Sequence, residues 1–454
     1  RARGGLGWPA GIIGTMKHSA LVRPDRSDQK ETIGNIAGKL EHMDQTVLMI
    51  AWHFPPLNHT ASKRTGCFAK YLASLGWKPI VLCVEWTKEN CLYDESYVKN
   101  YGKDITIVQV PYHPPAMNSA MDIVRKKATS FAFSHLIPIE WYRAAKAAIE
   151  RIVNQHKVSV IWASYPGLGG LPHTLADWAS RKWNIPWVAD YRDVPGQIGN
   201  IPIFHKVRLL LDAYREKKIM KSASEIVTVS AALKEKLEAR HGKTVTVIEN
   251  GFDSADYLDR KEIVEERKRI FRIVYAGNIY LPHRNPRPVL DAIGELIDSK
   301  ELKEEEIALE FYGTDEAVIG KVFKGSAYVK LVKRYPRLSN EAIVENLRSA
   351  TVLLQLAFGE DKGIATGKVY EYLAADRPIL SVPQDHDCVD KLLSETQAGV
   401  SCTGTFAIRK QIGQWYREWK ATGKIDLPRN AQEIGKYSRQ EQAKRLAAIL
   451  TRSI

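Results

Sequence analysis

GIATGKVYEYLAADRPIL, residues 363–380, is the most informative stretch of this 454-residue sequence. Thr366 and Gly367 come directly before a run with helical periodicity, and we expect them to open a helix. The apolar residues of the run lie three and four positions apart and would form its core face. The free N–H groups at the start of a helix attract phosphate. The stretch therefore predicts a helix whose first turn can bind an anion.

Lys368 and Glu371 lie three positions apart and share a different face of this predicted helix. A lysine suits a diphosphate, and a carboxylate suits the hydroxyl groups of a ribose. A surface ion pair on an ordinary helix is the alternative interpretation. The pattern alone does not decide between a ligand-binding pair and a surface ion pair.

Apolar runs of strand length alternate with helical periodicity on both sides of this stretch. In the first half, strands are predicted at 47–52, 80–84, 158–163, 187–190, 225–229 and 245–248, and helices at 63–75, 141–155, 171–182, 206–221 and 231–239. A charged segment follows Phe252. Strands are then predicted at 273–276, 308–312, 352–356 and 379–382, with helices at 287–297, 340–348, 368–374 and 439–450.

Continuous apolar strands separated by helices indicate parallel sheets covered on both faces. The predicted fold class is α/β, with two doubly wound Rossmann-like domains that face each other across a cleft. We expect a first domain at 43–255 and a second domain at 256–454, closed by a C-terminal helix. Residues 1–42 begin with Arg1 and are rich in glycine, and we interpret them as a disordered leader or a remnant of expression.

Composition and charge restrict the class of protein. Hydrophobic residues make up 44% and charged residues 26%, which is typical of a globular enzyme. The net charge of +14 suits nucleic acid, an anionic membrane or anionic small molecules. No nucleic-acid-reading motif is present, so nucleic acid is not an expected partner. The five cysteines are scattered, which argues against disulfides and zinc sites and favours a reducing compartment.

Basic residues cluster in two places. Arg125, Lys126 and Lys127 stand close to Phe131 and Phe133, a combination that suits an anionic membrane surface. The second cluster consists of Lys206, Arg208, Arg215, Lys217, Lys218 and Lys221. A solvated helix face is the alternative interpretation for both.

Several segments together resemble the glycosyltransferases of family 4, which have the two-Rossmann (GT-B) fold and assemble bacterial cell-surface polysaccharides. The donor helix of that family is similar to Gly367-Lys368 with Tyr370-Glu371-Tyr372-Leu373-Ala374 and Arg377-Pro378-Ile379-Leu380. Further matching segments follow in the family's order: His53-Phe54-Pro55-Pro56, Lys63-Arg64, Ser164-Tyr165-Pro166 with His173, Asp190-Tyr191-Arg192-Asp193, Glu249-Asn250-Gly251-Phe252-Asp253 and Tyr275-Ala276-Gly277-Asn278. The ordered set is specific, although each motif alone is weak.

The resemblance implies a sugar transfer, with retention of configuration, from a nucleoside-diphosphate sugar to a glycan or lipid-linked acceptor. The donor residues it implies are Asn278, Arg284, Arg287, Gly313, Thr366, Gly367, Lys368 and Glu371. Pro55, Pro56 and Arg64 would lie on the acceptor side, and His173, Asp193 and Lys368 are the catalytic candidates. A packing histidine at a helix start is the alternative for His173. The implied location is cytoplasmic and peripheral on the inner face of the membrane.

Two departures from the family stand out. Many members carry a glutamate eight positions before the one matched by Glu371, but this chain has Gly363 there, with Glu360 and Asp361 as the nearest substitutes. The segment from Asn58 to Ala61 also replaces glycines that let the backbone approach a ligand. The alternatives are a sugar-nucleotide 2-epimerase and a catalytically silent sugar-nucleotide-binding protein.

The resemblance implies no metal and no cofactor beyond the co-substrate, because side chains and a helix dipole would neutralise the leaving diphosphate. Asp385-His386-Asp387 is a metal–nucleotide signature in a different glycosyltransferase fold. A solvated loop is the interpretation we prefer for it.

Overall fold

The computed structural model describes residues 45–89, 91–97, 104–112, 139–165, 170–193, 213–258, 269–359 and 363–454. Contacts divide the chain into Arg1–Met43 and one compact unit, Asp44–Ile454. The description below concerns the second unit.

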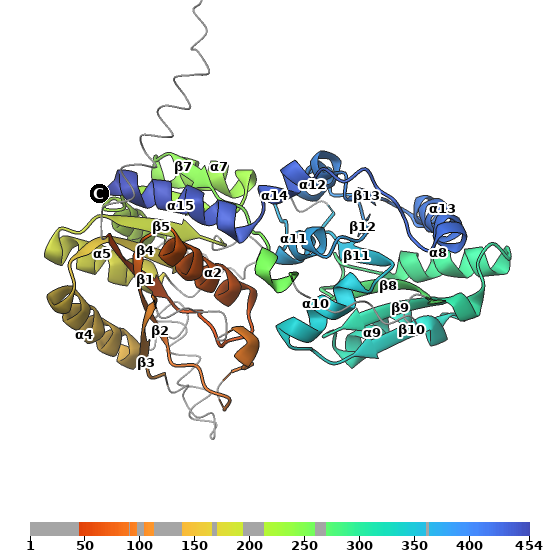
Figure 1. The fold of residues 1–454 in the computed structure, drawn as a ribbon, viewed down its shortest axis with the longest axis horizontal. Coiled ribbons are helices and arrows are strands. Elements are labelled where there is room, and N and C mark those ends of the chain that lie inside the picture. Colours follow the sequence, from red (N-terminus) through yellow and green to blue (C-terminus); the bar gives the residue numbers. More distant parts are fainter. Residues whose placement is uncertain are drawn as a thin grey trace, which may run out of the picture. The chain divides into compact units, whose positions relative to one another are not determined.

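Seven parallel strands form the first sheet (Figure 1), in the order β3-β2-β1-β4-β5-β6-β7. The strands are β1 (Thr46–Ala51), β2 (Lys78–Val84), β3 (Thr106–Val110), β4 (Val158–Tyr165), β5 (Trp187–Tyr191), β6 (Glu225–Thr228) and β7 (Val245–Val247). Leu48 pairs in register with Ile80 on one side and Ile161 on the other. All six residues of β1 are buried, as expected for a central strand covered on both faces.

Helices cover both faces of this sheet. α4 (Ile139–Gln155), α5 (Leu171–Trp183) and α7 (Ala231–His241) pack with Leu48 and Ile50 on one face. α2 (Thr60–Ser74) packs on the other face with Val47 and Met49. Successive side chains of β1 point to opposite faces of the sheet, so this strand contributes to two cores.

The second sheet has six parallel strands in the order β10-β9-β8-β11-β12-β13. They are β8 (Phe271–Ala276), β9 (Ile307–Tyr312), β10 (Val332–Tyr335), β11 (Val352–Leu356), β12 (Ile379–Val382) and β13 (Gly399–Ser401). One face packs against α8 (Arg287–Asp298), α9 (Glu316–Phe323) and α13 (Thr405–Thr422). The other packs against α10 (Asn340–Arg348), α11 (Gly367–Ala374) and α12 (Cys388–Thr396). Two doubly wound sheets confirm the predicted fold class.

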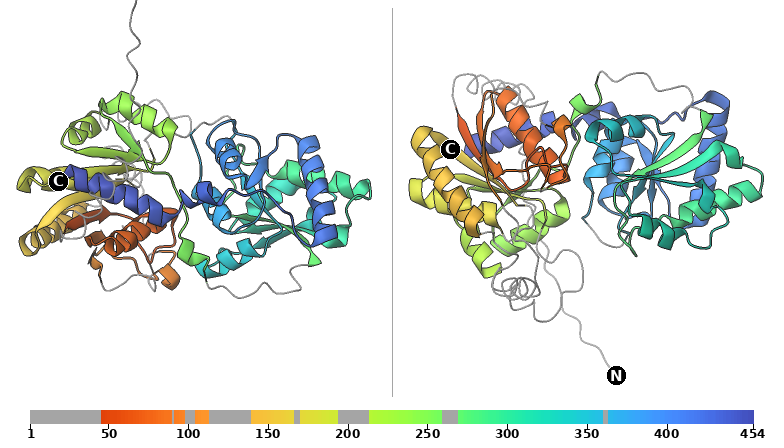
Figure 2. Two further views of the ribbon diagram at one scale, coloured as in Figure 1. Left: turned by 45° about the horizontal axis from the view of Figure 1, so that its top comes forward. Right: turned by 90° about the horizontal axis from the view of Figure 1, so that it is seen from below.

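The last helix, α15 (Arg439–Ser453), corrects the predicted domain boundary. Its apolar residues Ala443, Leu446 and Leu450 pack into the core that α2 forms with the first sheet. Figure 2 shows α15 lying along α2 rather than along the second sheet. The amphipathic pattern identified the helix, but a pattern along the chain contains no information about which core the apolar face will join.

Most predicted elements agree with the structure to within a few residues. Unpredicted elements include β3, whose mostly exposed residues give a weak strand pattern, as well as α9, β10, α12, β13 and α13. Of the helix predicted at 206–221, the described part is helical at 213–220.

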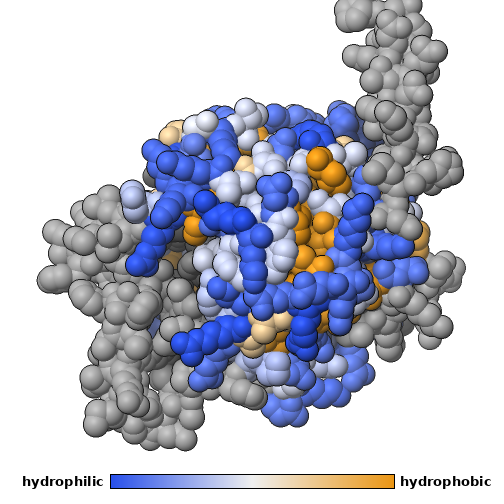
Figure 3. All heavy atoms as spheres, turned by 90° about the vertical axis from the view of Figure 1, so that its left-hand side faces the viewer, coloured by the Kyte–Doolittle hydropathy of each residue, from blue (hydrophilic) through white to orange (hydrophobic). Residues whose placement is uncertain are grey.

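On the side of α4 and α5, hydrophobic side chains are interspersed with long hydrophilic ones (Figure 3). Lys146 Nζ lies 4.2 Å from the centre of the Trp178 ring, and Lys182 Nζ lies 4.6 Å from that of Trp183. Such cation–π contacts stabilise indole rings that lie at a surface. Among the described residues, no helix combines the length and the apolar character needed to cross a membrane.

Candidate functional site

The start of α11 lies at the topological switch point of the second sheet. β8 and β11 are neighbours there, and the connections from them leave in opposite directions along the sheet. Ligands of doubly wound sheets bind beyond the carboxyl ends of strands at such a point. Gly277 and Asn278 follow β8, and Thr366 precedes α11, which comes after β11. The fold therefore brings together residues that are about ninety positions apart in the sequence.

Lys368 extends from the first turn of α11 over the loop that follows β8. A Cβ atom on Gly277 would lie 2.3 Å from Lys368 Nζ, so the amine occupies the space that a side chain would need. The Nζ donates to Tyr275 Oη at 3.1 Å. Burial and the nearby charge of Arg284 lower the pKa of Lys368 to about 7. Both the neutral and the protonated amine are therefore populated near neutral pH.

Arg284 belongs to the same loop, between β8 and α8, and is 3% exposed. Its guanidinium carbon lies 3.9 Å from the centre of the Phe358 ring. Burial lowers the pKa of Arg284, and its Nε is buried without a hydrogen-bond partner. The Oγ1 of Thr366, the N-cap of α11, is likewise buried without a partner. Buried polar atoms of this kind are costly when they have no hydrogen-bond partner.

The other predicted donor residues differ in position. Asn278 is exposed, and its carbonyl oxygen accepts from the Tyr275 hydroxyl at 2.6 Å. Gly313 follows β9 with φ 77°, and its N–H donates to Tyr335 O at 3.0 Å. The Nε of Arg287 donates to Asp291 on its own helix at 2.7 Å. The place of Arg287 in a donor site therefore remains a prediction.

Glu371, the predicted ribose ligand, pairs with Lys63 of α2 at 2.6 Å. Desolvation opposes the charge of Lys63, but the carboxylate of Glu371 raises its pKa well above the usual value. Tyr257 Oη donates to the backbone oxygen of Glu371 at 3.1 Å. A ribose at Glu371 would have to share the carboxylate with Lys63. Sequence reasoning missed this pair because the partners are 308 positions apart.

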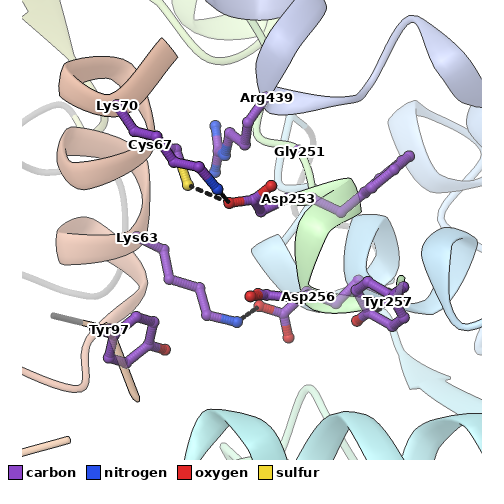
Figure 4. A pocket seen from close by; sticks show the side chains of 11 residues that line it. Lys63, Cys67, Lys70, Tyr97, Gly251, Asp253, Asp256, Tyr257 and Arg439 are labelled. Carbon is purple, nitrogen blue, oxygen red and sulfur yellow. Dashed lines mark hydrogen bonds and ion pairs between the residues drawn. The ribbon is translucent and has the colours of Figure 1, made fainter. Parts of the chain in front are cut away.

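The Lys63–Glu371 pair lies in a pocket (Figure 4) between α2 and residues 251–257. Lys63 and Lys70 project from α2 toward the segment that carries Asp253 and Asp256. Lys70 Nζ lies 2.9 Å from Asp253, and burial raises the pKa of Asp256. The pocket is thus lined by paired charges of both signs.

Arg64, predicted on the acceptor side, is fully buried. Its Nη2 and Nε donate to the two carboxylate oxygens of Asp190 at 2.8 and 3.3 Å, and its Nη1 donates to Ile248 O and Glu249 O. Such a bidentate pair fixes α2 to the carboxyl ends of the central strands. An acceptor contact by Arg64 remains a prediction.

His173 lies in the first turn of α5 and is 2% exposed. Its Nε2 is 3.1 Å from Ala163 O, and its ring packs against Trp187 and Tyr191. Burial lowers the pKa of His173 to about 4. This environment suits the packing interpretation, and the catalytic role remains a prediction. Asp193 is exposed at the end of β5.

The loop after β1 contains the predicted Pro55-Pro56 element, whose peptide bond is cis. The same loop reaches the second sheet, because Arg337 Nη2 donates to Asn58 O at 2.8 Å and to Asn58 Oδ1 at 3.0 Å. Arg337 belongs to no motif in the sequence and was not predicted.

Gly363 stands where the resemblance predicts a glutamate, and the local backbone suits glycine. Its φ of 79° favours glycine, and a Cβ atom there would lie 2.4 Å from the Cβ of Ala232. Glu360 and Asp361 lie outside the described residues. A side chain at position 363 is therefore excluded by the backbone and by the neighbouring helix α7.

Asp385-His386-Asp387 is a structural element and not the solvated loop that we expected. Asp385 is 3% exposed and accepts from the N–H groups of Asp387, Val389 and Asp390 at the start of α12. Asp387 accepts from the Gly363 N–H. Within the described ranges, no cluster of three or more His, Cys, Asp or Glu side chains is arranged to hold a metal ion.

The predicted membrane segment with Arg125, Lys126, Lys127, Phe131 and Phe133 lies outside the described residues, as do Lys206 and Arg208. Arg215, Lys217, Lys218 and Lys221 are exposed, which both interpretations of that cluster require.

Comparisons with known proteins agree with this geometry. Residues 63–256 match the family model described as Glycosyltransferase Family 4, which confirms the expected resemblance over much of the first sheet. A search among curated protein sequences finds no match.

Solved structures extend the likeness to most of the chain. A sucrose-phosphate synthase from Thermosynechococcus elongatus superposes with TM-score 0.60 at 12% identity, covering 90% of this chain and 98% of that one. A glycosyltransferase from Rickettsia africae gives TM-score 0.57 at 15% identity, covering 91% and 99%. Anabaena HepE, solved in complex with UDP-glucose, gives 0.54 at 12% identity, covering 89% and 99%. At these identities the likeness establishes the GT-B fold, and together with the family match it supports glycosyl transfer.

Proposed function

We propose that this chain transfers a sugar from a nucleoside-diphosphate sugar to a glycan or lipid-linked acceptor, with retention and without a metal, in cell-surface polysaccharide synthesis. The observation that carries the proposal is the cationic start of α11. Lys368 and Arg284 lie together there, and no described carboxylate forms a salt bridge with either of them. The UDP-glucose complex of HepE, which has the same fold, supports a nucleotide-sugar donor.

The proposed mechanism is electrostatic. When the bond between the sugar and the diphosphate breaks, negative charge grows on the leaving phosphate oxygen. Lys368 Nζ and the first N–H groups of α11 would stabilise this charge more in the transition state than in the bound substrate. Arg284 contributes a second positive charge held rigidly against Phe358. These groups take the part that a metal ion plays in other transferases.

Glu371 would accept hydrogen bonds from the ribose hydroxyls while it remains paired with Lys63. The ion pair also orients the carboxylate before the donor binds. The acceptor would enter beside the loop after β1, which contains Pro55 and Pro56. Arg64 and Asp190 give this wall of the site its shape.

A thermal-shift screen with uridine, guanosine, adenosine and cytidine diphosphates tests the donor site. At a hundredfold excess over its dissociation constant, the correct diphosphate stabilises the fold by about 2.7 kcal/mol. No stabilisation by any of the four would refute the proposal. Turnover of a nucleotide sugar without acceptor would indicate a 2-epimerase, and transfer that survives EDTA is expected if no metal takes part.

We also propose a peripheral, cytoplasmic location at the inner membrane, where a lipid-linked acceptor would lie. The support is the basic-aromatic sequence 125–133. The parent protein should float with anionic vesicles, and a variant with Arg125, Lys126 and Lys127 changed to Glu should not. Equal flotation of the two proteins would remove the support for this surface.

A further inference from the structure

Three aromatic rings lie parallel at the carboxyl edge of the first sheet. His53 follows β1, and its ring stacks on His59 with centroids 4.5 Å apart and 14° between the planes. Trp86, which follows β2, lies parallel to His53 at 6.4 Å and 7°. This edge is the switch point of the first sheet, because β1 lies between β2 and β4. The stack therefore lies where a doubly wound sheet binds ligands.

The hydrogen bond at His59 fixes its tautomer. His59 is the N-cap of α2, and its Nδ1 accepts from the Ala61 N–H at 3.1 Å. The neutral ring therefore carries its proton on Nε2, where it can donate to a ligand. His53 Nδ1 is buried without a hydrogen-bond partner. The stack thus offers one free donor and one unsatisfied ring nitrogen.

Arg192, which follows β5 and is partly exposed, lies close enough to both imidazoles for its charge to lower their pKa values. Among the described residues, its Nε has no hydrogen-bond partner. Burial and the neighbouring Arg64 lower the pKa of Arg192 to about 10, and Asp190 and Asp193 offset this in part. Asp190 is already bonded to Arg64 and Ser164, and Asp193 is exposed. The positive charge of Arg192 is therefore incompletely balanced by the described residues.

The two imidazoles respond to this charge. Burial, His59 and Arg192 lower the pKa of His53 to about 3. The ring of His59 is exposed, and its pKa is lowered by partial desolvation and by the charges of Arg192 and Arg337. A bound anion would offset the part of these shifts that comes from the guanidinium charge.

We propose that Arg192, His53 and His59 bind a phosphate group carried by the acceptor. The inference rests on the proposed function, because it assigns this edge to the acceptor. A guanidinium matches phosphate with two parallel hydrogen bonds, and the His59 Nε2–H adds a third donor. The donor diphosphate has its own cations, Lys368 and Arg284, on the second sheet. An acceptor that offered only sugar hydroxyls would bring no opposite charge to the partly buried Arg192.

The phosphate can belong to a soluble sugar phosphate or to a lipid. Titration calorimetry with glucose 6-phosphate, with glucose as the control, tests the first source. Vesicles of phosphatidic acid, compared with phosphatidylcholine, test the second. We expect measurable binding of at least one phosphate-bearing probe and none of its uncharged counterpart.

Two variants locate the binding. Arg192→Gln should weaken the phosphate probe by about 10- to 100-fold, as expected for the loss of a charge-assisted hydrogen bond. His59→Asn should weaken it by about 10-fold while keeping the fold, because asparagine is also a good N-cap. Arg181→Gln, which changes an exposed arginine on α5, is the matched control and should bind like the parent. NMR of the histidine ring protons should show that Arg192→Gln raises the pKa of both imidazoles.

Unchanged phosphate affinity in both variants would overturn the inference. It would also be overturned if the variants lost affinity for nucleoside diphosphate but not for the phosphate probe. If these variants bind the phosphate normally while Lys368→Met loses nucleoside diphosphate, the acceptor inference falls and the proposed function stands. If the phosphate probe binds through Arg192 but no nucleoside diphosphate binds, the proposed function falls and the anion site at Arg192 stands alone.

Discussion

Lys368 gives the sharpest test of the donor site, because its charge state changes close to neutral pH. With a pKa of about 7, half of the amines carry a proton at pH 7, and roughly one in a hundred does so at pH 9. A diphosphate binds the protonated form and restores the pKa toward its usual range. The affinity for nucleoside diphosphate should therefore fall by about 50-fold between pH 7 and pH 9.

The assay is titration calorimetry of the parent and two variants with one nucleoside diphosphate at both pH values. Lys368→Arg keeps its charge throughout this range, so its affinity should change little. Lys368→Met should bind weakly at both values. At pH 8 the parent should take up about 0.9 proton per diphosphate, measured as the dependence of the heat on the buffer.

The titration of the diphosphate itself affects the parent and the variants equally. The ratio of the parent's affinity to that of Lys368→Arg therefore reports only the effect of protonating Lys368. Lys234→Met, which changes a lysine on α7, is the control and should follow the parent. Identical pH profiles for the parent and Lys368→Arg would refute the coupling between this amine and the diphosphate. The position of the Lys368 amine over Gly277 would then be a packing feature alone.

Three further predictions follow from the described contacts. Burial lowers the pKa of His173 from 6.5 to about 4, so the unfolded chain binds a proton in this interval that the folded chain does not, and His173 should contribute about 3 kcal/mol of the stability lost from pH 6.5 to pH 4. Urea unfolding of the parent and of His173→Gln at both pH values measures this contribution as the difference between their losses, and equal losses would contradict it. Arg64→Met should lower the free energy of unfolding by about 3–5 kcal/mol because it leaves Asp190 buried and unpaired. Adding Asp190→Asn to this variant should recover part of the lost free energy. A loss under about 1 kcal/mol in Arg64→Met would show that the pair is solvated. Glu371→Gln should weaken both nucleoside and nucleoside diphosphate by about 1.5–3 kcal/mol in calorimetry, and normal nucleoside binding would assign Glu371 to its pair with Lys63 alone.

The alternation of strands and helices could be predicted from the sequence because local patterns encode it. A strand buried on both faces needs a continuous apolar run, as in β1, and an amphipathic helix needs apolar residues three and four apart, as in α11. The same patterns failed at the edge strand β3, whose residues are mostly exposed. Where the second sheet begins was likewise legible from the charged segment after Phe252.

The sequence by itself determined that Thr366, Gly367 and Lys368 stand together at the start of α11, since they are adjacent in the chain. Tertiary structure alone decided which charges face which. Lys63 meets Glu371, Arg192 lies by His53 and His59, and α15 returns to the first core. These contacts join residues from tens to hundreds of positions apart, and their strength depends on burial and distance, neither of which is encoded locally.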